Sequence, residues 1–185
     1  MTENEWQECG DPRRMLEAIQ GPTDHQLTAF SAACCRRIWS LIMDDESHRA
    51  IEFLESQAES AQTPQQIAVA ANAISCDSSY FSVNSSVYDA TRNHSAAKAV
   101  GYAVRHLLPP THINYSKDRL ASAIHTALFA QFAVGKSVST DDDSDYDPND
   151  EDPGADWLVQ QTESAEAVEQ CKIIRSIFPS PGAVP

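Results

Sequence analysis

Residues 24–43 read DHQLTAFSAACCRRIWSLIM, and their apolar positions recur every three or four residues. This spacing predicts an amphipathic helix from Asp24 to about Met43, because side chains three and four apart share one face of a helix. Trp39 and Cys35 flank the apolar stripe, so we expect the helix to be covered on more than one side. The stripe itself consists of Leu27, Phe30, Cys34, Ile38 and Leu41.

Helix signals continue on both sides of this stretch. Thr2 and Glu5 form a capping box, and Asp11 followed by Pro12 is an N-cap with a first-turn proline. A loop is expected over 76–86, because its serines, Asp and Asn compete for helical hydrogen bonds. Further helices are expected over 45–60, 63–74, 86–108, 116–135 and 156–178. With no pair of alternating strands, the predicted fold class is all-α, a compact bundle or array of about six to eight helices.

The net charge of the chain is concentrated in one segment. The 185 residues carry 27 acidic and 13 basic side chains, a formal net charge of −14. Nine of the acids, and no base, lie between Asp141 and Asp156. Nonspecific nucleic-acid binding is disfavoured, because it requires basic side chains that neutralise phosphates. We predict four parts: a helical domain over 1–136, a disordered acidic insert over 137–156, a final helix over 157–178 that packs back on the domain, and a flexible tail over 179–185.

The sequence also indicates the cellular compartment in which the protein is expected. No apolar run approaches the roughly 18–20 residues of a membrane span, and residues 1–5 are acidic where a signal peptide would be basic and then apolar. The five cysteines include no CxxC pair, which favours reduced, buried thiols over a disulfide framework or a zinc knuckle. These features predict a cytoplasmic protein without a cofactor.

Two short motifs imitate known catalytic or nucleotide sites without their context. Residues 130–137, AQFAVGKS, are similar to a phosphate-binding loop, but such a loop follows a strand and opens a helix. Here a helix comes first, and Gly135 is expected to end it. Ser95 and Lys98 match the Ser-x-x-Lys of acyl-transfer enzymes, but the companion motifs are missing.

Candidate metal ligands are equally incomplete. Asp45 and His48 have the spacing of a carboxylate–histidine pair, but a second pair on another helix is missing. The acids from Asp141 to Asp145 alternate as in a calcium loop, but Tyr146 stands where the sharp turn needs glycine. A site built from dispersed histidines stays open, with three candidates: His106, His112 and His125.

The best candidates for partner recognition lie near the end of the helix predicted over 24–43. Arg36 and Arg37 point in directions about 100° apart, and Trp39 follows them. Arginine and tryptophan dominate interface hot spots, which predicts an anchor patch for a partner. Alternatively, both arginines pair with acids of the next helix and tie the two helices together. The acidic insert is expected to attract a basic protein partner, through Asp141, Asp142, Asp143 and Asp145.

The amino-terminal motifs resemble a known group of proteins. Glu5-Trp6, Asp11-Pro12 and the run from Cys34 to Trp39 are together similar to a paralogous family of uncharacterised proteins from planctomycete bacteria. The resemblance covers residues 1–55 and returns over 171–179. It implies a helical domain in a bacterial cytoplasm and brings no known activity.

Two classes of function remain. The first is a non-enzymatic protein-interaction module, such as an adaptor, an immunity protein or an antitoxin-like protein. The second is a small-molecule- or metal-binding enzyme whose site is built from the dispersed histidines. Few glycines and the lack of a phosphate loop or an acid–base pair favour the first class. A deep pocket at the histidines would favour the second class, and a flat exposed surface at Trp39 the first.

Overall fold

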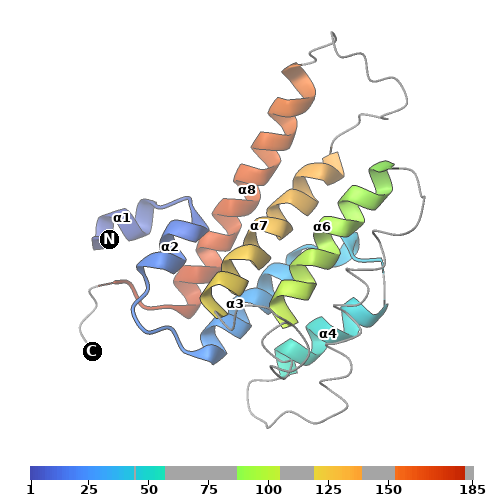
Figure 1. Ribbon diagram of the computed structural model, residues 1–185. Coiled ribbons are helices and arrows are strands. Elements are labelled where there is room, and N and C mark those ends of the chain that lie inside the picture. Colours follow the sequence, from blue (N-terminus) through green and yellow to red (C-terminus); the bar gives the residue numbers. More distant parts are fainter. Residues whose placement is uncertain (44, 57–86, 105–118, 139–152, 182–185) are drawn as a thin grey trace.

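The structure, a computed structural model of the chain, describes residues 1–43, 45–56, 87–104, 119–138 and 153–181. Within these ranges every regular element is a helix, which confirms the predicted all-α array (Figure 1). The helix predicted over 63–74 and the loop predicted over 76–86 lie outside the described residues. The elements are α1 (Glu3–Glu8), α2 (Pro12–Ala18), α3 (Asp24–Arg37), the 3₁₀ helix η1 (Trp39–Leu41), α4 (Asp45–Ser56), α6 (Val87–Val104), α7 (Arg119–Val138) and α8 (Pro153–Ile177).

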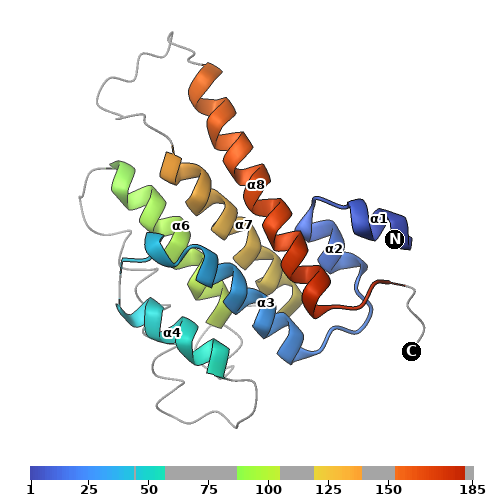
Figure 2. The ribbon, with the colours of Figure 1, turned by 180° about the vertical axis from the view of Figure 1, so that it is seen from behind.

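Helix α7 lies at the centre of the array and packs against α2, α3, α6 and α8. Helices α6 and α7 lie side by side on the face seen in Figure 1, and α3, α4 and α8 cover the opposite face, seen in Figure 2. Small side chains let α6 and α7 approach each other closely. The buried alanines are Ala96, Ala97, Ala99 and Ala103 on α6 and Ala123, Ala127, Ala130 and Ala133 on α7.

The amino-terminal helices begin where their capping residues predict. The capping box of α1 is formed, with the Glu5 amide donating to Thr2 Oγ1 at 3.3 Å and the Thr2 amide donating to Glu5 Oε2 at 2.6 Å. Asp11 Oδ1 accepts the amide of Arg13 at 2.9 Å at the start of α2. Gly21, with φ of 61°, makes the turn into α3 in a conformation that favours glycine. Both predicted helix starts are confirmed.

The helix predicted from Asp24 to Met43 is shorter in the structure. Helix α3 ends at Arg37, and the chain tightens into η1. Ile38 and Ile42, which flank this turn, are both buried. Ile38 and Leu41 are three residues apart, a spacing that a 3₁₀ helix also keeps on one face. Apolar periodicity therefore could not mark this helix end.

Gly135 does not end its helix, contrary to the sequence-based expectation. Helix α7 continues through Gly135 to Val138. A Cβ atom at Gly135 would lie 2.5 Å from Glu163 Oε1 and 2.6 Å from Glu163 Cγ, so the missing side chain lets α8 lie against α7. Helix α8 also begins earlier than predicted, at Pro153, because proline suits the first position of a helix.

The buried core joins the first helices to the last one. Trp6, Met15 and Leu16 lie in one buried cluster with Ile174 and Phe178 of the α8 segment. The Arg175 guanidinium donates to two main-chain oxygens, Trp6 O at 3.0 Å and Cys9 O at 2.7 Å. Helix α8 therefore closes the core over α1 and α2.

Three of the cysteines are buried, as expected from the sequence. Cys34, Cys35 and Cys171 are free thiols with no exposed surface. Burial raises the pKa of Cys171 to about 12 and also raises the pKa of Cys34 and Cys35. At neutral pH these thiols stay protonated and act as small apolar side chains.

No helix in the described ranges is both long enough and apolar enough to cross a membrane.

Candidate functional site

The side chains of α2 and α7 enclose an open groove. Figure 1 shows α8 behind these two helices. The volume of the groove is about 600 Å³, which falls in the range of ligand-binding sites. Helix α7 supplies one wall, α2 the other, and α8 a small side chain between them. We call this site the α2–α7 groove and define it by Pro12, Leu120, Ile124, Leu128, Gln131 and Ala167.

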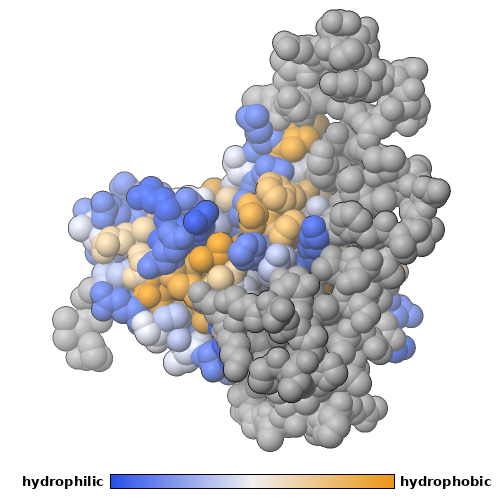
Figure 3. Space-filling view, viewed as in Figure 1, coloured by the Kyte–Doolittle hydropathy of each residue, from blue (hydrophilic) through white to orange (hydrophobic). Residues whose placement is uncertain are grey.

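The α7 wall of the groove is apolar and partly open to solvent. Leu120, Ile124 and Leu128 follow one another at intervals of one helical turn, and Phe132 continues the row one turn further. Leu128 and Phe132 are each 39% exposed. Figure 3 shows apolar surface gathered over α7, beside the mostly hydrophilic surface of α1 and α2. A row of large apolar side chains left partly uncovered beside a groove is typical of a binding surface.

The α2 edge of the groove is charged. Arg13 Nε donates to Glu17 Oε1 at 2.9 Å, and both side chains are largely exposed. Such a surface pair is worth less than about 1 kcal/mol, so either side chain can exchange its partner for a ligand. Residues 1–20 carry five acids and two bases, so this edge has a net charge of −3.

His125 lies at the α7 edge of the groove and is held in place from two sides. Its Nδ1 lies 2.7 Å from Ala121 O, and its ring stacks on Tyr102 at 4.7 Å between ring centroids. Tyr102 stacks in turn on Phe129, and the Lys98 ammonium lies 5.2 Å from the centre of the Phe129 ring. These contacts between α6 and α7 fix the rim of the groove.

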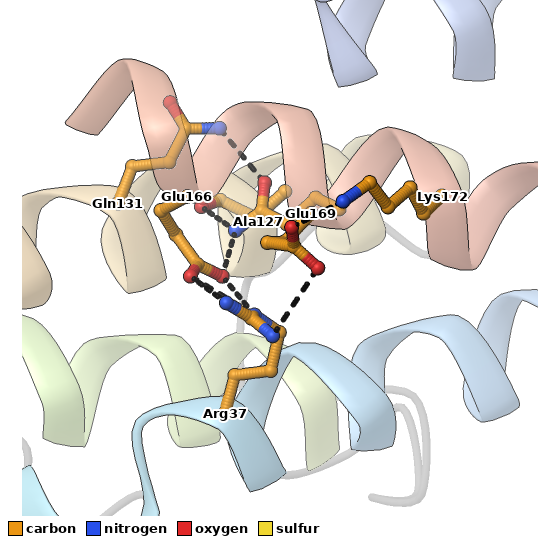
Figure 4. Close-up of polar contacts among 7 residues, drawn as sticks. Arg37, Ala127, Gln131, Glu166, Glu169 and Lys172 are labelled. Carbon is orange, nitrogen blue, oxygen red and sulfur yellow. Dashed lines mark hydrogen bonds and ion pairs between the residues drawn. The ribbon is translucent and has the colours of Figure 1, made fainter. Parts of the chain in front are cut away.

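A chain of polar side chains runs from Gln131, in the groove, to the opposite side of α8 (Figure 4). Gln131 Nε2 donates to Gln170 Oε1 at 2.8 Å. Gln170 is fully buried, and its Nε2 donates to Ala127 O at 3.1 Å and to Glu166 Oε1 at 3.3 Å. Glu166 in turn accepts from Arg37 of α3. We call Arg37, Glu166, Gln170 and Gln131 the polar relay.

In the ion pair at the far end of the polar relay, the Glu166 side chain is buried and the Arg37 side chain is partly exposed. Arg37 Nε lies 2.9 Å from each oxygen of Glu166, and Nη2 lies 2.8 Å from Oε2. The Glu166 side chain is 4% exposed and that of Arg37 is 36% exposed. The hydrogen bond to Glu166 raises the pKa of Arg37, so the guanidinium stays charged. The pair fixes α3 against α8.

The residues of the predicted anchor patch already contact other helices of the same chain. Arg36 Nε donates to Glu55 Oε1 of α4 at 2.8 Å, and the Arg36 guanidinium carbon lies 3.9 Å from the centre of the Trp39 ring. Trp39 stacks on His48 of α4 at 4.1 Å. Arg36 thus pairs with an acid of the next helix, as the alternative interpretation predicts. Arg37 pairs with an acid of α8 instead. Partner binding through these residues stays a prediction.

Several candidates from the sequence fall outside the described part of the chain. These are Asp141, Asp142, Asp143, Asp145, His106 and His112. Of the three dispersed histidines, the structure describes His125, which lies at the groove. The residues described here contain no cluster of three His, Cys, Asp or Glu side chains suited to a metal ion.

The remaining sequence motifs lie within helices or contact neighbouring parts of the chain. Residues 130–137 lie inside α7, so no phosphate-binding loop forms there. Lys98 lies over the Phe129 ring. His48 Nε2 lies 3.2 Å from Trp39 O, in contact with the η1 turn rather than with a metal partner.

Sequence reasoning missed the α2–α7 groove and the polar relay. The helix predicted over 116–135 carries the apolar row from Leu120 to Phe132, and its alanines from Ala123 to Ala133 form a second row. Two apolar rows on one helix are the signal for a second surface. No local signal links Gln131 to Gln170, which are 39 residues apart.

Comparisons with known protein families, with curated proteins and with solved structures find no match. The resemblance of residues 1–55 to planctomycete paralogues therefore stays a prediction.

Proposed function

We propose that the protein is a non-enzymatic interaction module that binds an amphipathic, basic helical segment of a partner protein in the α2–α7 groove. The observation that carries this proposal is the exposed apolar row on α7. Leu128 and Phe132 are each 39% exposed, and the row continues into the groove through Ile124 and Leu120. Side chains of this kind bind the apolar face of a partner helix.

The length of the row suits a short helix. From Leu120 to Phe132 the row spans about 18 Å, because each helical residue rises 1.5 Å. A bound helix of about three to four turns would place its apolar residues along this distance at the usual intervals of three and four. The open side of the groove leaves room for the polar face of that helix in solvent.

The charge of the groove indicates the charge of the partner. The α1–α2 edge has a net charge of −3, and the whole chain has a net charge of −14. A basic segment is attracted to both, which speeds association and disfavours acidic competitors. The predicted role of the acidic insert agrees with a basic partner, and the roles of adaptor, immunity protein or antitoxin-like protein all fit this proposal.

A small-molecule site is a second candidate function. His125, Gln131 and Arg13 lie around the same cavity of about 600 Å³, a suitable size for a ligand with both apolar and polar groups. Catalysis by the histidines would need His106 or His112 beside His125. Peptide binding is favoured, because the apolar row extends beyond the cavity to Phe132.

The test is a selection of displayed random peptides of about 16 residues, long enough for four helical turns, on the whole protein. We expect enriched peptides to carry apolar residues at intervals of three and four with Lys and Arg between them. Leu128→Glu and Phe132→Glu should abolish their binding. Leu158→Glu is the matched control, because Leu158 is also 39% exposed but lies on α8 away from the groove. Peptides that bind Leu128→Glu as tightly as wild type would overturn the proposal.

A further inference from the structure

We propose that Gln131 presents a fixed hydrogen-bond acceptor in the α2–α7 groove and thereby selects a segment that places a donor against it. In this proposal Glu166, together with Ala127 O, sets the polarity of Gln131 through Gln170, and Glu166 acts as a positioning residue. The inference rests on the proposed function, because it names what the bound segment must carry.

The polarity of the relay starts at Glu166. A carboxylate offers acceptors, and a guanidinium offers donors. Arg37 donates to both oxygens of Glu166. The group that reaches Glu166 from Gln170 must also be a donor, so the Nε2 end of Gln170 faces Glu166.

The same reasoning fixes the next two amides. Gln170 Nε2 has two hydrogens, and it donates to Glu166 Oε1 and to Ala127 O, which are both acceptors. The Oε1 end of Gln170 therefore faces Gln131 and accepts from Gln131 Nε2 at 2.8 Å. A reversed amide at Gln170 would place its oxygen against two other acceptors.

Gln131 consequently presents its oxygen to the groove. Its Nε2 is held by Gln170, and Figure 4 shows Oε1 of Gln131 on the side of the amide away from the dashed line drawn at Nε2. Gln131 lines the groove, and within the described part of the chain no group donates to this oxygen. A bound segment without a donor at this place would bury the acceptor unpaired, which lowers affinity. Lysine, arginine and hydroxyl side chains supply such a donor.

Replacing Glu166 by glutamine should weaken the selection for a donor. The new amide can offer an NH₂ group to Gln170, so Ala127 O is then the one acceptor of the two that still requires the NH₂ group of Gln170. A turned Gln170, which would let Gln131 present its NH₂ group to the groove, becomes less unfavourable but still places its oxygen against Ala127 O. A purely structural role for Glu166 would lower affinity for all peptides alike and leave their ratio unchanged.

The experiment uses two helical peptides of about 16 residues, long enough to cover the row, built from leucine on one face and lysine on the other. One central apolar position carries homoserine, which can donate, or O-methylhomoserine, which can only accept. The three central apolar positions are tested in turn by calorimetry. At one of them we expect wild type to bind the homoserine peptide about tenfold more tightly, the effect of one hydrogen bond.

The variants separate positioning from stability. Gln131→Leu should bring the affinity ratio of the two peptides close to one. Glu166→Gln should lower the ratio without reversing it, because Ala127 O still holds the NH₂ group of Gln170. Glu169→Gln is the matched control, because it removes the same charge from α8 and also weakens a contact to Arg37, yet Glu169 does not bond to Gln170. Glu169→Gln should keep the wild-type ratio.

Each result has a defined meaning. A ratio near one in wild type at all three positions, or a wild-type ratio that persists in Gln131→Leu, would overturn the inference about Gln131. Binding of the parent leucine–lysine peptide that is lost in Leu128→Glu would still support the proposed function. Failure of the parent peptide to bind overturns both. If Glu166→Gln does not fold, as judged by circular dichroism, Gln131→Leu alone still decides the inference.

Discussion

The carboxyl end of α3 and the α2–α7 groove use their side chains in opposite ways. At the end of α3, Arg36, Arg37 and Trp39 are all engaged by other helices of the same chain. In the groove, Leu128 and Phe132 remain partly exposed. The residue types that usually mark an interface lie at the first place, and the uncovered surface lies at the second. Residue type alone therefore does not identify a binding site, because the contacts within the chain decide what remains available.

The largest effect that tests this comparison is expected from Arg37→Ala. The substitution leaves the buried Glu166 carboxylate without its cationic partner, so we expect a loss of about 3–5 kcal/mol in the free energy of unfolding. Urea denaturation followed by circular dichroism measures it. The double variant Arg37→Met/Glu166→Leu should recover most of the loss, because it removes both charges. A loss below about 1 kcal/mol would show that Arg37 is available for a partner after all.

A smaller loss is expected from Gly135→Ala, which tests the close contact between α7 and α8. The new methyl group would lie 2.5 Å from Glu163 Oε1 and 2.6 Å from Cγ, so the Glu163 side chain must move. We expect a loss of about 1 kcal/mol in the free energy of unfolding, measured by thermal denaturation. The double variant Gly135→Ala/Glu163→Ala should be at least as stable as Glu163→Ala, because alanine favours the helix over glycine. If Gly135→Ala destabilised the wild type and the Glu163→Ala variant equally, the contact with Glu163 would not be the source of the strain.

Arg36→Ala sharpens the contrast between the two neighbouring arginines. Arg36 pairs with Glu55 and lies over Trp39, but Arg36 and Glu55 are both exposed. The same contact lowers the pKa of Glu55. We expect a loss of no more than about 1 kcal/mol in urea denaturation, because solvent screens this pair. A loss as large as that of Arg37→Ala would contradict the view that burial of Glu166 separates the two positions.

The smallest effect on stability is expected in the groove itself. Leu128→Ser should change the free energy of unfolding by roughly 0.5 kcal/mol, because the side chain keeps much of its surface in solvent. Ile174→Ser, in the fully buried core, serves as the reference and should cost several times more. The ratio of the two losses in one denaturation series measures how far the α7 row is uncovered. Equal losses would mean that Leu128 belongs to the core.

The sequence was sufficient to predict the helical class and several helix starts. Capping residues act within four residues of the chain, so Thr2, Glu5 and Asp11 could be assigned to their roles from the sequence. The ion pair of Arg36 with α4 was foreseen as an alternative, because Glu55 lies on the next helix.

Other features depend on contacts between distant segments and could not be predicted in this way. The role of Gly135 is defined by Glu163, and the role of Arg37 by Glu166, which lies 129 residues away. The groove exists because α2 and α8 lie beside α7, whereas the sequence pattern of α7 shows only that apolar residues occur on two sides. Long-range packing overrides local pattern at all of these positions.

The contact of Arg175 with Trp6 O and Cys9 O bears on how the protein is synthesised. Residues 1–43 leave the ribosome before α8 does, but Trp6, Met15 and Leu16 share their core with Ile174 and Phe178. The apolar side chains of the early helices therefore stay uncovered until α8 has been synthesised. The amino-terminal helices thus need protection from premature association during translation, and the emergence of α8 ends that need.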